Sequence, residues 1–449
     1  MAHVLVMSLQ GAMNRLQVSL NVYPRLEFLP VATSFVEKAS TAFGLAATEA
    51  LALTLATEEV FTYLCGAAAA GTEVLISCRG HGYYVEEEIA FKAQEFDMRA
   101  FNLTGATSFE DEGRTRETGL LIASRMVDLF RFAESGDRLN LTLVKEKAYP
   151  AYSGEAVSTA KPLDEFVVRA PDTEELKAFV SLTNSRYQRY LIPSSFSYPG
   201  KVVDMVAVGD YRAAVAVDPP GSIGGGLVWR RESAKMVEFY GPYLFAQPPE
   251  STMAEALIDA CLHDVARSES LGLISRYPTP EIPADYFEPL GSLAFRQADG
   301  ALVELTACYR HLEEDLGSAV WADPRLEPFL SREYGRLAFA REIRRVEDAG
   351  ESSWPFSVLS AEFDRSQARV TLRPVWWGRD SEEIVGAHVE TLRKEALSCL
   401  FFEMDLGKAW QTHFTAALLD NGFEPRLMIP YGGAGDIVVF EHTSDGSGS

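Results

Sequence analysis

Cysteine and long apolar runs are both scarce in this 449-residue sequence. Its five cysteines form no CxxC pair, a pattern that favours a reducing compartment over a disulfide framework or a zinc site. No stretch reaches the roughly 18 to 20 consecutive apolar residues that a membrane helix requires, and Leu45–Ala56 is interrupted by Thr48 and Glu49. The apolar start Met1–Leu9 has no Lys or Arg before it, so no secretory signal is expected. We therefore expect a cytoplasmic protein that contacts no membrane.

Positive charge is scarce as well. Lys and Arg total 41 against 64 Asp and Glu, which gives a formal net charge of -23. A protein with this excess of negative charge repels phosphate backbones and anionic lipids. Nucleic acid is therefore excluded as an expected partner.

The distribution of apolar residues predicts a mixed fold of the α/β (α+β) class with several domains. At roughly 150 residues per domain, the length corresponds to about three domains. Residues before 150 alternate strand-like and helical patterns, which is typical of a two-layer sandwich. The polar segment after them has the composition of a linker. The predicted limits are 1–149 for the first domain, 150–162 for the linker, 163–317 and 318–443 for two mixed α/β units, and 444–449 for a disordered tail.

Residues 318–443 repeat the later part of the element order predicted for the unit before them, which indicates an internal duplication. The two copies also share a short Phe-Glu-Pro sequence, in Phe287-Glu-Pro-Leu-Gly of the first copy and Gly422-Phe-Glu-Pro-Arg of the second. In the first copy, the apolar runs Val202–Val208 and Tyr211–Val217 predict a pair of strands.

Glycine runs and histidines in this half are weighed as ligand sites. Gly224–Gly226 and Gly432–Gly435 lie beside predicted strands and precede no helix, so we predict tight turns or close backbone packing there and no phosphate cradle. His263, His311 and His388 have no partner at a spacing typical of metal ligands, so no metal site is predicted.

A glutamate in a predicted helix of the first domain is the first candidate site residue. The run Glu59-Val-Phe-Thr-Tyr63 resembles the Glu-x-x-x-Asn motif of the GHKL ATPase superfamily, with the anti-sigma factor serine kinases the most similar members. In that family the Glu prepares the attacking hydroxyl and the Asn, four residues later on the same helical face, binds magnesium. The resemblance covers about residues 16–147 and implies ATP with magnesium as cofactor. Here Tyr63 replaces the Asn, and a phenol is a poor magnesium ligand.

Two further positions carry the same resemblance. Phe96-Asp97 matches the end of the family's Asp-x-Gly-x-x-Phe-Asp motif, so Asp97 is a candidate nucleotide-binding residue. Phe91 stands where the family has the Asp that accepts a hydrogen bond from adenine. Gly119 matches the glycine motif that leads into a helix facing the phosphates. The resemblance thus implies a GHKL-type sandwich whose nucleotide site is degenerate.

The second half resembles a different family. Residues 165–442 are similar in element order to one or two copies of the GNAT acetyltransferase fold, with a strand that ends in Tyr240-Gly-Pro-Tyr-Leu-Phe245. This resemblance implies acetyl-CoA as cofactor and Tyr240 or Tyr243 as the proton donor.

The loops that would hold the pyrophosphate of the coenzyme depart from the family pattern. Active members use backbone N–H groups of a basic, glycine-rich loop. Here the loop of the first copy, Ala246–Thr252, contains two prolines, which have no N–H, and a glutamate. The second loop, Trp377–Glu383, contains three carboxylates. We predict helix caps at Thr252 and Asp380 in place of coenzyme binding.

These observations favour a catalytically degenerate regulatory protein. Its expected partner is a protein, such as a regulatory factor, with a small-molecule ligand as a further candidate. Two alternatives stay open: an acyl-CoA-dependent N-acyltransferase using Tyr240 or Tyr243, and an ATP-dependent protein serine kinase that uses Glu59 on a sigma-factor regulator. The candidate cofactors are ATP with magnesium and acetyl-CoA, each at a site that has lost part of its binding groups.

Overall fold

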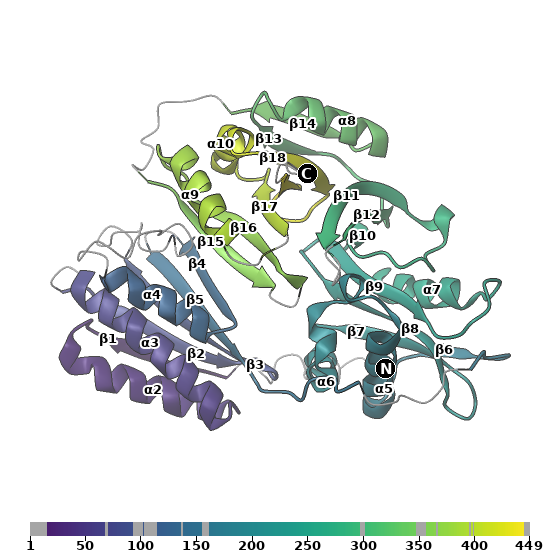
Figure 1. The fold of residues 1–449 in the computed structure, drawn as a ribbon, viewed down its shortest axis with the longest axis horizontal. Helices are drawn as coiled ribbons and strands as arrows, with labels where there is room; N and C mark the ends of the chain where they lie inside the picture. The colour runs from purple at the N-terminus through teal and green to yellow at the C-terminus, as the bar shows by residue number, and fades with distance from the viewer. Residues whose placement is uncertain are drawn as a thin grey trace. The chain divides into compact units, whose positions relative to one another are not determined.

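The computed structural model describes residues 16–67, 71–92, 102, 115–135, 138–154, 161–296, 301–346, 356–364, 367–394, 397 and 399–443. Within them the chain is a mixed α/β protein, which confirms the predicted fold class (Figure 1). The chain divides into two compact units. Unit 1 consists of Met1–Tyr149, Ser353–Glu362 and Leu372–Glu395, and unit 2 consists of Pro150–Ser352, Phe363–Thr371 and Ala396–Ser449.

One boundary between the two compact units coincides with a predicted domain limit. The first stretch of unit 1 ends at Tyr149, the end of the first predicted domain. Residues 318–443, predicted as one copy, contribute to both units. The limits within 163–443 stay a prediction, and the tail 444–449 lies outside the described residues.

Unit 1 contains a five-stranded sheet in which neighbouring strands run antiparallel. In β2, Val74, Ile76 and Cys78 are fully buried, because alternate residues of a strand point to the same face. Helices pack against this buried face, which gives the two-layer arrangement that the sequence predicts. The strand order is β1 (Gln17–Val22), β2 (Val74–Gly80), β3 (Tyr84–Lys92), β5 (Arg138–Glu146) and β4 (Leu129–Ser135), and the helices are α2 (Leu29–Ala42), α3 (Ala47–Ala67) and α4 (Thr115–Met126).

Residues far along the chain complete the core of unit 1. Val358 and Trp376 are buried in the same apolar cluster as the residues of α3 and β2. Asn102 fastens the later segment: its Nδ2 donates to the carbonyl of Ser357 at 2.7 Å, and its Oδ1 accepts from the N–H of Leu359 at 2.9 Å. The core of unit 1 therefore combines side chains of the first 149 residues with two that come more than two hundred residues later.

Unit 2 contains a seven-stranded sheet. Its helices are α5 (Thr173–Arg186), α6 (Pro199–Val208) and α7 (Met253–Val265). The strand order is β11 (Glu288–Arg296), β12 (Leu302–His311), β10 (Gly272–Ser275), β9 (Met236–Leu244), β8 (Ile223–Arg231), β7 (Arg212–Val217) and β6 (Val167–Arg169).

One predicted strand of this region is wrong. Val202–Val208 belongs to helix α6, which begins with Pro199 in its first turn and ends at Gly209, where φ is 85°. Proline suits the first turn of a helix because its missing N–H has no intrahelical partner there. Glycine adopts the left-handed conformation of a helix end without steric cost.

A second sheet repeats part of this strand order. Its order is β15 (Val358–Asp364), β16 (Arg369–Trp376), β17 (Cys399–Asp405), β19 (Ile437–His442) and β18 (Phe423–Ile429). The strands β8, β9, β10, β12 and β11 follow the same sequence of neighbours. Helix α9 (Ser381–Lys394) connects β16 to β17, as α7 connects β9 to β10. The repeated order agrees with the predicted internal duplication. The remaining elements here are β13 (Ser318–Ala322), which pairs in parallel with β14 (Arg341–Arg345), and the helices α8 (Glu327–Leu337) and α10 (Phe414–Asp420).

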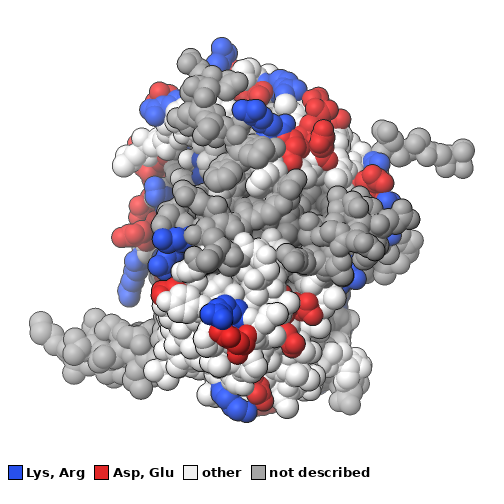
Figure 2. All heavy atoms as spheres, turned by 90° about the vertical axis from the view of Figure 1, so that its left-hand side faces the viewer, with Lys and Arg blue, Asp and Glu red and all other residues white. Residues whose placement is uncertain are grey.

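The surface carries both signs of charge, with uncharged areas between the charged groups on the face in Figure 2. Unit 1 exposes apolar side chains: Leu16 is 74%, Leu26 64% and Leu51 55% exposed. Across the described ranges, every helix is too short or too polar to cross a membrane. All five cysteines are free thiols.

Candidate functional site

The separation of two neighbouring strands defines the candidate site in unit 2. Strands β9 and β10 run parallel, and their paired residues are Met236 with Gly272, Val237 with Leu273, and Glu238 with Ile274. Beyond Glu238, β9 continues to Leu244, whereas β10 ends at Ser275. Beyond Glu238 and Ile274 the two strands no longer pair, so side chains occupy the space between them.

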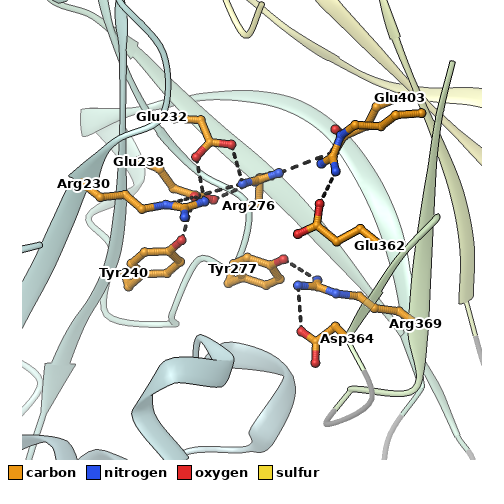
Figure 3. A network of polar contacts seen from close by, with 11 residues as sticks. Arg230, Glu232, Glu238, Tyr240, Arg276, Tyr277, Glu362, Asp364, Arg369 and Glu403 are labelled. Carbon is orange, nitrogen blue, oxygen red and sulfur yellow. Dashed lines mark hydrogen bonds and ion pairs between the residues drawn. The ribbon is translucent and has the colours of Figure 1, made fainter. Parts of the chain in front are cut away.

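Glu238 occupies the point of separation and is fully buried. Arg276, just after β10, donates to it from Nε at 2.6 Å and from Nη2 at 2.9 Å (Figure 3). Arg230 of β8 donates from Nε at 3.1 Å and from Nη2 at 2.9 Å. Burial alone would raise the pKa of Glu238, but Arg276 and Arg230 outweigh it and hold the pKa well below its usual range. Glu238 is thus an ionised, fully engaged acceptor.

Both predicted proton donors lie on β9 and are buried. Tyr240 is 4% exposed and donates its hydroxyl proton to Glu238 at 2.7 Å. Tyr243 is 0% exposed and donates to the carbonyl of Leu191 at 2.8 Å. Burial raises the pKa of each phenol well above its ordinary value. Each proton is therefore already used inside the protein.

A second polar group, unnoticed in the sequence, lies at the end of β9. Tyr187 accepts a hydrogen bond from the N–H of Leu244 at 2.7 Å and donates to Oε1 of Glu281 at 2.7 Å. Within the described ranges, the other oxygen of Glu281, Oε2, is buried without a hydrogen-bond partner. Glu281 lies in a loop, where no periodic pattern in the sequence could have pointed to it.

In the loop between β9 and α7, the Gln247 side chain forms hydrogen bonds within the protein. The Gln247 side chain accepts from the N–H of Leu163 at 3.2 Å and donates to the carbonyl of Phe245 at 2.8 Å.

The predicted helix cap at Thr252 is wrong. Thr252 precedes α7, but its side chain makes no capping hydrogen bond. The Ser251 hydroxyl accepts from the N–H of Met253 instead, at 3.3 Å. In the second copy, the Asp380 carboxylate accepts from the N–H of Ser357 at 2.5 Å.

The glycine runs are sites of close packing, as predicted. The Asp405 carboxylate accepts from the N–H groups of Gly407, Ala434 and Gly435, each at 2.9 Å. This carboxylate fills the place that a bound phosphate would take in a glycine-rich cradle. In β8, a Cβ at Gly226 would lie 2.6 Å from the Phe179 ring.

In unit 1 the structure brings two of the predicted nucleotide-site residues together. Glu59 of α3 lies against Gly119 of α4, where an added Cβ would approach Glu59 Oε2 to 2.5 Å. Tyr63 and Phe91, the replacements for family residues, are 6% and 1% exposed and belong to the apolar core. Asp97 lies outside the described residues.

The core of unit 1 also holds titratable groups that sequence reasoning missed or placed elsewhere. Glu87 of β3 is fully buried, as is His388 of α9. Burial raises the pKa of Glu87 to about 8 and lowers the pKa of His388 to about 3. In the part of the chain that the structure describes, no three His, Cys, Asp or Glu side chains gather as a metal site would require.

Comparison with known proteins finds likeness in structure alone. No family model matches the sequence, and no curated protein matches it. Aminoglycoside 6'-acetyltransferase type Ii covers 33% of this chain with 98% of its own, at 13% identity and a TM-score of 0.26. A putative phosphinothricin N-acetyltransferase covers 33% with 100% of its own, at 16% identity and a TM-score of 0.26. A GNAT superfamily phosphinothricin acetyltransferase from Sinorhizobium meliloti, in complex with AcCoA, covers 33% with 89% of its own, at 16% identity and a TM-score of 0.25.

Proposed function

We propose that the protein is a cytoplasmic regulatory protein that binds a ligand or a protein partner and catalyses no group transfer. The observation that carries this proposal is the closed network around Glu238. A general acid or base needs a proton or a lone pair that is free to reach the substrate, with a pKa near the working pH. Glu238 is saturated by two guanidinium groups, and the proton of Tyr240 is committed to Glu238.

The cofactor loops support the same proposal. Pro248 and Pro249 offer no N–H to a pyrophosphate, and the side chain of Gln247 bonds to the chain itself. In unit 1, Tyr63 and Phe91, which stand where the GHKL motifs have the magnesium-binding Asn and the adenine-binding Asp, are packed in the apolar core. We therefore propose a GHKL-like module that has lost tight binding of ATP with magnesium.

Exposed apolar side chains of unit 1 support a protein as the partner. Three leucines of this unit are more than half exposed: Leu16 just before β1, Leu26 just before α2, and Leu51 in α3. Contiguous apolar patches are typical of surfaces that a partner covers, and we propose that a partner covers these side chains.

The test is a search for turnover in the purified full chain. We expect no release of coenzyme A from acetyl-CoA with any of a panel of primary amines, and no phosphate transfer from ATP to a protein serine. Thermal unfolding should shift with neither ligand, whereas a ligand at 100 times its Kd would add about 2.7 kcal/mol to the unfolding free energy. Amine-dependent release of coenzyme A would overturn the proposal.

One observation favours a second candidate, an acyl-CoA-dependent N-acyltransferase. The early end of β10 leaves backbone groups of β9 beyond Glu238 without a strand partner on that side, where an extended ligand could pair. Under this candidate Tyr240→Phe or Tyr243→Phe lowers kcat, while Tyr23→Phe, at an exposed phenol of unit 1, leaves it unchanged. The kinase alternative makes a separate prediction, loss of phosphate transfer in Glu59→Ala.

A further inference from the structure

Strand β1 forms one end of the sheet of unit 1 and pairs, among the described strands, with β2. The outer edge of an end strand presents backbone N–H and C=O groups that can pair with a further strand, and proteins usually protect it with charged side chains or proline. Of the strands that end the three larger sheets in the described part of the chain, β1 is the one without a charged side chain. It contains no proline either. Strand β1 therefore lacks the usual protection against pairing.

The apolar side chains of β1 are more exposed toward its start. Val22 is 8% exposed, Val18 is 41% exposed, and Leu16, just before the strand, is 74% exposed. Alternate residues of a strand point to the same face, so these side chains and Leu20 form one apolar row. Leu20 packs against the core of unit 1. The row is thus buried at one end and open to a partner at the other.

The pattern of residue types in this segment is the same in both directions. Leu16–Val22 reads Leu-Gln-Val-Ser-Leu-Asn-Val, so Ser19 has an apolar residue, an amide residue and a second apolar residue on each side. When two copies of the strand pair in antiparallel fashion about Ser19, Val18 faces Leu20 of the second copy. Each apolar side chain then meets another apolar side chain on the same face of the sheet, and each amide meets an amide. The segment is therefore complementary to itself.

Charges beside the two amides fit the same pairing. Arg79 Nε donates to Gln17 Oε1 at 2.9 Å, and Asn21 Nδ2 donates to Glu73 Oε2 at 3.0 Å. Pairing about Ser19 places Gln17 opposite Asn21 of the second copy, whose Oδ1 can accept from Gln17 Nε2. The row of hydrogen bonds then leads from a guanidinium donor to a carboxylate acceptor, and the symmetry forms it twice. Because the paired segment itself is uncharged, two copies of a protein with a net charge of -23 repel each other least there.

We propose that the protein forms a two-fold symmetric dimer in which the β1 strands of two copies pair in antiparallel fashion about Ser19. The sheets of unit 1 then join into one continuous sheet, and the pairing covers Leu16 and Val18. This inference rests on the proposed binding of a partner at the exposed apolar side chains of unit 1, and it names a second copy as the partner at β1.

The first experiment measures the dimer in the purified full chain by analytical ultracentrifugation. We expect a concentration-dependent dimer. Val18→Lys should raise its Kd at least about tenfold, because charge on an edge strand opposes pairing and each dimer contains the change twice. The matched control is Val167→Lys in β6, a valine that is 63% exposed on another end strand. It adds the same charge and should leave the Kd unchanged. A monomer at every concentration, or equal Kd values for the two variants, would overturn the proposal.

The second experiment tests the register and keeps Val18. Residues directly opposite in antiparallel strands have Cα atoms about 4.5 to 5.5 Å apart, within the range that a disulfide spans. Ser19→Cys should therefore form a disulfide-linked dimer under mild oxidation. In Gln17→Cys the two thiols are four residues apart in this register, about 13 Å along the strand, and should not link. The unmodified protein, with its own free thiols, gives the background. Equal linkage in both variants, or none in Ser19→Cys, would overturn the proposed pairing.

Failure of this inference and failure of the proposed function are distinguishable. A monomeric chain that turns over neither acetyl-CoA nor ATP would overturn the dimer and leave the proposed function, with a different protein as the partner. A dimeric chain that releases coenzyme A with an amine would overturn the proposed function and leave the dimer.

Discussion

Thr57 and Glu87 share a hydrogen bond of 2.8 Å in the core of unit 1. The hydroxyl of Thr57 is also 2.8 Å from the carbonyl of Leu53, four residues earlier in α3. Because a hydroxyl has one proton and a carbonyl can only accept, Thr57 donates to Leu53 and Glu87 donates to Thr57. Glu87 is thus a neutral carboxylic acid, and its raised pKa, due to burial, agrees with this arrangement.

Unit 1 should lose stability as the pH rises. The pKa of Glu87 is about 8 in the folded protein, against an ordinary value of 4.5. Below the ordinary value both states hold the proton and the contribution is complete. Between the two values only the unfolded state releases it, so the free energy of unfolding falls by a few kcal/mol in total, then levels off. Urea unfolding from pH 5 to pH 9 measures this slope.

Glu87→Gln should flatten the slope and make unit 1 more stable than the unmodified protein at pH 9. The amide keeps the shape and a donor to Thr57, but it cannot ionise. Glu37→Gln, at a side chain that is 49% exposed, is the control and should keep the slope. An unaltered slope in Glu87→Gln would show that other groups dominate.

Arg276→Met should be strongly destabilising. The change leaves Glu238 buried with one guanidinium partner fewer, and breaking a buried ion pair costs about 3 to 5 kcal/mol. Arg344→Met breaks an exposed pair with Glu342 and should cost less than about 1 kcal/mol. The double change Glu238→Gln with Arg276→Met should recover part of the loss. Denaturant unfolding compares the three, and equal costs for the two single variants would refute this account of the network.

Asp405→Ala should create an anion site. It removes the acceptor for the N–H groups of Gly407, Ala434 and Gly435, which lowers the free energy of unfolding by about 1 to 3 kcal/mol. Sulfate should then stabilise the variant in a saturable way by binding those N–H groups. Asp420→Ala, at an exposed carboxylate, gives the background effect of sulfate on this protein. The same response in both variants would mean that the loop offers no site.

Two glycine changes should differ in cost although their closest contacts are similar. Gly226→Ala places a Cβ 2.6 Å from the Phe179 ring and 3.0 Å from the carbonyl of Ala214, so packed core atoms must move at a cost of about 1 to 3 kcal/mol. Gly119→Ala meets the end of the flexible Glu59 side chain, which can swing away. The helix preference of Ala, about 1 kcal/mol over Gly, then offsets the loss. Thermal unfolding decides between this ranking and its reverse.

The sequence predicts elements well where polar and apolar residues follow one clear period, and it fails where an apolar run without a period fits two structures. Alternation at Leu16–Leu20 marks β1, and the Leu and Ala spacing around Glu59 marks α3. Val202–Val208 reads equally well as a strand or as a buried helix, because a run of seven residues rich in Val carries no decisive period. Pro199 and Gly209 were the available signals, since each stands at one end of the helix.

The candidate site was less predictable than the fold. A single carboxylate in the apolar run around Glu238 is a visible signal of a buried charge. Its partners, however, come from β8 (Arg230) and from the residue just after β10 (Arg276), and they share no spacing with it. Likewise, Asp405 and Gly435 meet only because β17 pairs with β19. Contacts of this kind depend on strand register, which the sequence of one strand does not contain.

The late segments of unit 1 also set the point during synthesis at which this unit can complete its fold. Val358 and Trp376 fill its core, and Asn102 bonds to Ser357 and Leu359. When residues 1–149 have been synthesised, their sandwich therefore still has part of its interior open to water. Its hydrophobic core closes only after more than two hundred further residues, including most of unit 2, have been translated. A nascent chain should therefore expose apolar surface of this core until Trp376 has been added, and chaperones bind surface of this kind.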